Sequence, residues 1–85
     1  NAPNPFGAET MIRVDLPQPR HVELTIYDIQ GRSVATILDE EMIAGTHEVA
    51  WDGRGGGGEP LASGIYFCIL RTEGYRQAIR MMLAH

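Results

Sequence analysis

The stretch Trp51-Asp-Gly-Arg-Gly-Gly-Gly-Gly-Glu-Pro-Leu-Ala-Ser-Gly-Ile-Tyr-Phe67 decides the fold class. One apolar segment ends at Trp51, a glycine-rich run follows, and an alternating apolar segment begins at Ile65. Five of the six residues from Gly53 to Gly58 are glycines, which adopt positive φ at little steric cost, and Asp52 is suited to accepting a hydrogen bond from a backbone N–H two residues later. The pattern predicts two β-strands joined by a long hairpin loop, and nothing in it resembles a catalytic loop.

The rest of the chain alternates apolar and polar residues between short turn signals. This period of two is typical of half-buried strands, which we expect over residues 10–16, 21–29, 33–38, 46–51, 65–71 and 76–83. The 65–71 segment is apolar on both faces, which favours a central position in its sheet. Gln30-Gly31 is a candidate two-residue turn, and Thr72 to Tyr75 is a second tight turn. Asp39 to Gly45 breaks the pattern and is expected to be an exposed loop or a short turn of helix.

These elements predict an all-β protein with an immunoglobulin-like antiparallel β-sandwich of about seven strands. The sandwich is expected over residues 10–85. Residues 1–9 are expected to form an extended, proline-containing arm or the first edge strand, because each proline disfavours helix in the residue before it.

Length and charge narrow the function classes. Eighty-five residues make one small domain, and the net charge of -4 provides no basic face for nucleic acid or anionic lipid. No apolar run approaches the ~20 residues of a membrane span, and no signal peptide opens the chain. The first residue is not methionine, which favours a processed product or an excised piece of a longer protein.

No group of residues predicts catalysis, a metal site or a cofactor. Cys68 lies within a predicted strand, where a small buried hydrophobic residue is favoured over a nucleophile. The three histidines are scattered, the acidic residues lack EF-hand spacing, and Ser33 and Ser63 have no nucleophile elbow around them. The glycine run lacks the lysine and the following helix of a phosphate loop. The sequence therefore predicts a non-enzymatic domain.

Two segments remain candidates for recognition. Asn1 to Phe6 is extended and able to pair with a sheet edge, either of its own chain or of a neighbour, and both alternatives stay open. Arg76 to Leu83 is the last predicted strand, for which pairing within the chain is favoured.

Seven short motifs, taken in order, resemble a known module. They are Asn4-Pro5-Phe6, Ile12 to Pro17, Val22 to Arg32, Gly45 to His47, Trp51 to Gly53, Ala62 to Phe67 and Arg80 to Leu83. This order and spacing resemble the C-terminal sorting domain of type IX secretion substrates and, equally, the related Ig-like domain of flagellar hook-capping proteins.

The resemblance to sorting domains implies a non-catalytic module at the C-terminus of an exported bacterial surface protein. Such a module is recognised by an outer-membrane translocon and is cut from its cargo by a sortase-like cysteine peptidase. We therefore expect an exported protein, at the cell surface or outside the cell. The resemblance also implies that ten residues shape the recognition or assembly surface: Asn4, Pro5, Phe6, Gly31, Arg32, Asp52, Gly53, Gly64, Tyr66 and Arg80.

The alternative function is a structural subunit of an extracellular filament or appendage. In that interpretation the N-terminal arm completes the sheet of the next subunit, and head-to-tail strand exchange builds a homopolymer. The hook-capping resemblance makes such an assembly role a reasonable precedent. An enzyme or small-molecule binder is disfavoured, because a sandwich of this size leaves little interior for a pocket.

Overall fold

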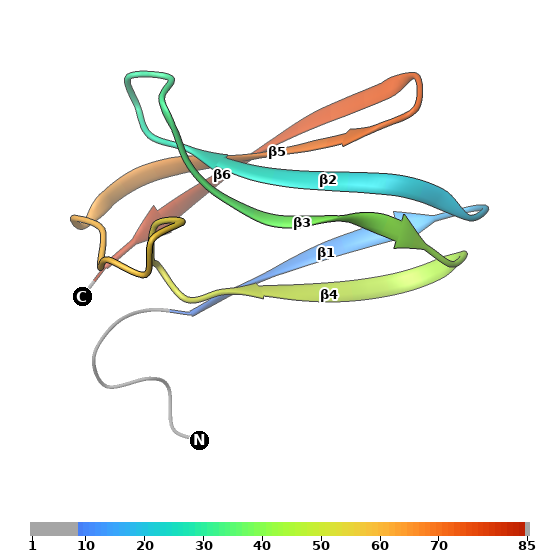
Figure 1. Ribbon diagram of the computed structural model, residues 1–85, viewed down its shortest axis with the longest axis horizontal. Coiled ribbons are helices and arrows are strands. Elements are labelled where there is room, and N and C mark those ends of the chain that lie inside the picture. Colours follow the sequence, from blue (N-terminus) through green and yellow to red (C-terminus); the bar gives the residue numbers. More distant parts are fainter. Residues whose placement is uncertain (1–8, 85) are drawn as a thin grey trace.

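The computed structural model describes residues 9–84 and contains two antiparallel β-sheets that face each other (Figure 1). The strands are β1 (Thr10–Leu16), β2 (Arg20–Tyr27), β3 (Ser33–Met42), β4 (Gly45–Trp51), β5 (Gly64–Thr72) and β6 (Tyr75–Leu83). β1 and β4 form a two-stranded sheet, and the other four form a sheet in the order β3-β2-β5-β6. The predicted antiparallel all-β sandwich is confirmed, with six strands in the described residues. The seventh strand, expected in the N-terminal arm, falls on residues that are not described.

The core forms because alternate residues of each strand point between the sheets. In β2 the three inward side chains, Val22, Leu24 and Ile26, have 0% exposure, and β1 contributes a matching buried row from the opposite sheet. Complete burial of one such aliphatic side chain is worth about 1.5–3 kcal/mol relative to an exposed position. The buried cluster that joins the sheets also includes Ala35, Trp51, Tyr66, Cys68, Leu70, Met81 and Leu83.

β5 occupies the central position that its two apolar faces predict. It pairs with β2 on one side and β6 on the other. Its inward residues Tyr66, Cys68 and Leu70 pack in the core, and Ile69 on the opposite face is also buried. The small sheet therefore covers the inward row of β5.

Trp51 and Tyr66 connect the two sheets through their aromatic rings. Trp51 ends β4 and Tyr66 lies near the start of β5, and their ring centroids are 5.5 Å apart in an edge-to-face arrangement. Each ring also has its polar group satisfied: Trp51 Nε1 donates to the carbonyl oxygen of Arg54 at 3.1 Å, and the Tyr66 hydroxyl donates to that of Ala62 at 2.7 Å. These bonds fix both ends of the connection between β4 and β5.

That connection is not a hairpin loop, and the expectation for residues 51–67 is wrong in this respect. β4 pairs with β1, whereas β5 pairs with β2 and β6, so the segment crosses from one sheet to the other. The physical reason is that the Trp51 and Tyr66 rings contact each other edge to face within the core. This contact puts their strands in opposite layers. Turn residues show where the chain reverses but carry no information on which strands pair.

The expected break over Asp39 to Gly45 is wrong for residues 39–42, and only Ile43 and Ala44 lie outside the strands. β3 continues to Met42 and stays paired with β2 through that acidic run. β3 is an edge strand, where charged side chains project into water and discourage pairing with other chains. The acidic residues of β3 also contact a side chain of β2, since His21 Nε2 lies 2.5 Å from Asp39 Oδ1.

The two tight turns have different outcomes. Thr72 pairs with Tyr75 around a two-residue turn, as expected, with Gly74 at φ +73°. The β2–β3 hairpin is confirmed, but its loop is longer than the expected two residues, because Tyr27 pairs with Ser33. The backbone N–H of Asp28 donates to the carbonyl oxygen of Arg32 at 3.0 Å, which closes the five-residue loop.

The Tyr66 hydroxyl bond provides a test of this fold. Tyr66→Phe should lower the free energy of unfolding by about 1 kcal/mol, because it leaves a part-buried carbonyl without its donor. Tyr75→Phe is the matched control, since Tyr75 is exposed, and its effect should stay within about 0.5 kcal/mol. Urea unfolding of both variants measures the difference, and equal midpoints would contradict the assigned role of Tyr66.

Candidate functional site

The β2–β3 loop holds two of the predicted site residues, Gly31 and Arg32. Gly31 has φ +85°, which a side chain disfavours, and Arg32 Nε donates to Asp28 Oδ2 at 2.9 Å. Asp28 Oδ1 also accepts backbone N–H groups from Gln30 at 2.9 Å and Arg32 at 3.0 Å. These hydrogen bonds lower the pKa of Asp28 below its ordinary value. The largest contribution comes from the Arg32 backbone N–H, and the Arg32 guanidinium and the Gln30 N–H add to it. The loop is therefore organised around the Asp28 carboxylate, which caps the turn.

Asp52 and Gly53 begin the connection between the sheets. Asp52 Oδ1 accepts the backbone N–H of Arg54 at 3.1 Å, and Gly53, at φ +81°, accepts the N–H of Leu61 at 3.1 Å through its carbonyl oxygen. The glycine run then forms a compact turn whose Gly56 N–H donates to the Val34 carbonyl oxygen on β3 at 2.8 Å. The connection is thus ordered by its own backbone and is tied to the larger sheet.

The remaining described site residues lie on β5 and β6. Gly64 starts β5 with φ +155°, and Tyr66 is buried against Trp51, so its role is structural. Arg80 is exposed on β6, on the outer face of the larger sheet, directly across from Phe67. Asn4, Pro5 and Phe6 lie outside the described residues.

The outer face of the larger sheet carries apolar, aromatic and arginine side chains close together. Ile69 is buried there, Phe67 is half-buried, and the Arg71 guanidinium lies 5.8 Å from the centroid of the Tyr27 ring. Arg80 borders this face at the β6 side. A cation over an aromatic ring at this separation is attracted by the ring's negative face, so this surface combines aromatic and basic groups.

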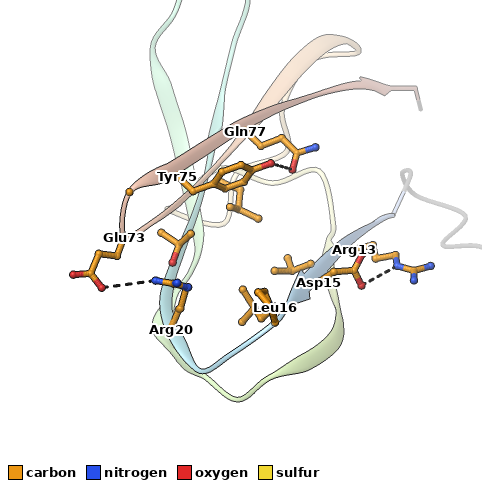
Figure 2. A pocket seen from close by; sticks show the side chains of 12 residues that line it. Arg13, Asp15, Leu16, Arg20, Glu73, Tyr75 and Gln77 are labelled. Atoms are coloured by element: carbon orange, nitrogen blue, oxygen red, sulfur yellow. Dashed lines mark hydrogen bonds and ion pairs between the residues drawn. The ribbon is translucent and has the colours of Figure 1, made fainter.

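A hollow of about 650 Å³ lies between β1 and the turn that joins β5 to β6 (Figure 2). Leu16 lies on the β1 side, whereas Tyr75 and Gln77 project from β6 on the other side. Ion pairs between Arg13 and Asp15, at 3.3 Å, and between Arg20 and Glu73, at 3.9 Å, account for the charges of its rim.

Sequence reasoning missed this hollow, although one signal for it is present. The alternation of the last predicted strand, residues 76–83, puts Ile79, Met81 and Leu83 on one row, and extending that row backwards by two residues at a time adds Gln77 and Tyr75. An exposed aromatic side chain on a core-facing row indicates that part of the row is uncovered. The sequence pattern assigns Tyr75 to the turn from Thr72 to Tyr75, outside this strand.

Neither Cys68 nor the metal-ligating residue types of residues 9–84 form a reactive group. Burial raises the pKa of the Cys68 thiol to about 11, so the thiolate needed for nucleophilic attack is disfavoured. Within residues 9–84 no three His, Cys, Asp or Glu side chains gather as a metal site would require. The same part of the chain has no helix long and apolar enough to cross a membrane.

Comparison with known proteins adds a family assignment. The model of the family described as "FlgD Ig-like domain" matches residues 3–70. The crystal structure of FlgD from P. aeruginosa is similar, with a TM-score of 0.68 and 23% sequence identity, over 88% of this chain and 60% of that chain. No curated protein matches. The chain therefore spans about three fifths of the length of the solved FlgD, and the family match confirms the predicted immunoglobulin-like fold class.

The family match also corrects the function predicted from the sorting-domain resemblance. Of the two modules that the motifs resemble, the one that matches is the Ig-like domain of hook-capping proteins, not the type IX sorting domain. The predicted translocon and sortase-like peptidase partners, and cleavage from a cargo, are wrong with it. Motif residues such as Gly31, Arg32 and Asp52 build turns of this sandwich, so they report the fold and do not distinguish the two functions.

The Asp28 loop gives a prediction about pH. Because the folded-state pKa of Asp28 is lowered, its contribution to stability is complete above the ordinary value of 3.8 and is lost as the pH falls through the lower folded-state value. Asp28→Ala should therefore be less stable than the parent near pH 7, and the gap should narrow as the pH falls below 3.8.

Urea unfolding across that pH range measures the gap. Ile29→Ala is the matched control, since Ile29 is an exposed, uncharged residue of the same loop and should give a pH-independent difference. A gap for Asp28→Ala that persisted unchanged at the acid end would contradict the role of the ionised carboxylate.

Proposed function

This chain belongs to the family of FlgD Ig-like domains, and on that premise we propose that it is a non-catalytic structural module of a flagellar hook-capping type of protein. The observation that carries the proposal is the family match over residues 3–70, which covers most of the chain. In this role the module serves as a scaffold during hook assembly, and the protein acts after export, outside the inner membrane.

The geometry of the described residues supports a scaffold more than an enzyme. Asp28 and Asp52 use their hydrogen bonds to hold their own loops. A ligand pocket instead needs polar groups that converge on a ligand. What the domain offers to a partner is surface: the aromatic and arginine face of the larger sheet and the hollow between β1 and the β5–β6 turn.

A flagellar assay tests this proposal. Deleting residues 10–83 in frame from the parent gene in the source bacterium should leave hooks absent or of abnormal length, because the cap lacks one of its modules. Electron microscopy of isolated hooks measures the outcome. Hooks of normal number and length would overturn the proposal.

Two controls separate assembly from simple loss of protein. Immunoblotting should find the truncated parent protein at its ordinary abundance. The exposed substitution Gln18→Ala, in the connection between β1 and β2, should leave hooks unchanged, whereas Trp51→Ala, which removes a core side chain, should reproduce the deletion.

A further inference from the structure

The outer face of the larger sheet, which is turned away from β1 and β4, separates its charges by strand. Among the described residues, three carboxylates of this face lie on β3 and β2, and three guanidinium groups lie on β5 and β6. His21 lies between two of the carboxylates and adds positive charge only when it is protonated. One half of the face is therefore acidic and the other half basic. The six residues are Asp39, Glu41, Glu23, Arg71, Arg76 and Arg80.

One row of this face crosses all four strands and consists of charged residues. The antiparallel register places Asp39 beside Glu23, and on the other side of β2 it places Glu23 beside Arg71. Arg71 in turn lies beside Arg76. The row thus has the order acid, acid, base, base. Like charges directly opposite each other on neighbouring strands are destabilising, so each end of the row favours contact with a group of the opposite sign.

The described part of the chain does not neutralise this row. The three arginines of the face form no ion pair with any described residue. Glu23 lies across from Arg71, but its Oε2 accepts the Thr25 hydroxyl at 2.9 Å. The Arg71 guanidinium instead lies 5.8 Å from the centroid of the Tyr27 ring. Residues 1–8 contain no charged side chain, so they cannot supply the missing carboxylates.

We propose that this face binds the same face of a second copy, about a two-fold axis parallel to the strands. Such an axis lays β3 of one copy over β6 of the other, and β2 over β5. Asp39 then meets Arg76, and Glu23 meets Arg71, in both halves of the contact. Sheets packed face to face keep their strands within about 30° of each other, which this axis allows.

This inference goes beyond the proposed function and rests on the geometry of one face. Its tests use the isolated chain, whereas the proposed function is tested by the hooks of the bacterium. Either can therefore fail without the other.

The neighbouring rows add apolar area to the contact. Phe67 and Ile69 of β5 lie on this face, and so does Met82 of β6, which has 65% exposure. A second copy covers these side chains while it pairs the charges. A partner of a single charge sign, broad enough to cover the face, would meet like charges on one half of it. The change of sign across the row therefore favours a second copy over a purely acidic or purely basic partner.

The size of the face determines the strength of the contact. Its four strands have 8–10 residues each. With about 4.8 Å between strands and about 3.3 Å per residue, they present a flat area of roughly 500 Å². This is small for a stable complex, in which each partner buries roughly 800 Å², so we expect a Kd of about 0.1 mM. Modules held in one assembly meet at effective concentrations in the mM range, at which such a contact forms.

Sedimentation equilibrium of the full 85-residue chain tests the contact. The apparent mass should rise from 9.4 kDa towards twice that value between about 10 μM and about 1 mM protein. Added salt should lower it, because ions screen exposed charge pairs. The mass of a monomer up to about 1 mM would overturn the proposal, as would concentration-dependent amide NMR shifts confined to β1 and β4.

Two charge reversals identify the face. Asp39→Arg and Arg76→Glu each bring like charges together in the two-fold contact, so each variant alone should dimerise at least about tenfold more weakly than the parent. An equimolar mixture of the two variants should regain the parent's affinity. In the mixture, position 39 of one variant meets position 76 of the other with opposite signs at both ends of the contact. A mixture as weak as its components would contradict the pairing.

Two controls exclude other modes of association. Glu48→Arg changes the net charge as Asp39→Arg does, but it lies exposed on β4 of the smaller sheet and should leave dimerisation unchanged. Equal weakening by the two substitutions would mean that net charge controls association and would overturn the proposal. Removal of residues 1–8 should also leave dimerisation unchanged. Loss of the dimer on their removal would show that this segment joins the copies, which would likewise overturn it.

Discussion

The edge-to-face contact between Trp51 and Tyr66 is the constraint on which the rest of the structure depends. It sets the end of β4 against the start of β5 across the core, so the intervening segment must cross between layers instead of closing a hairpin. Aromatic pairs of this kind contribute about 0.5–1.5 kcal/mol beyond the area that they bury. Hydrogen bonds to Arg54 and Ala62 fix each ring from its polar end. Because Trp51 holds β4 in one layer and Tyr66 holds β5 in the other, β4 pairs with β1 and β5 pairs with β2 and β6.

The described strands form one sheet of two and one of four. This division determines which surfaces the domain exposes to other molecules. The core residues of β2 and β5 are fully covered, but the small sheet does not reach the Tyr75 end of β6. The opposite face of the larger sheet carries Phe67 and the arginines of β5 and β6. A domain with a packed core and an aromatic–basic face is suited to docking in an assembly. This agrees with the scaffold role proposed from the family match.

The strands were predictable because each follows one periodicity, and burial enforces it. Ile12, Val14 and the inward row of β2 recur at every second position, and all of them are buried. β3 was cut short at Leu38 because an acidic run carries no apolar alternation, although an edge strand tolerates one. Layer assignment was not predictable, since it depends on contacts between residues far apart in the chain. The sequence motifs resembled two families equally, because Gly31, Arg32 and Asp52 build turns and carry no information on function.

Native-state amide hydrogen exchange of the isolated chain at low concentration tests the central claim, that β4 and β5 lie in different sheets, most directly. In β5, bonded on both sides by β2 and β6, amides along the strand should exchange slowly. In β4, the amides that bond to β1 should exchange slowly and the alternate amides fast, because β5 gives β4 no hydrogen bonds. Uniformly slow exchange along β4, as a β4–β5 hairpin within one sheet would give, would contradict this account.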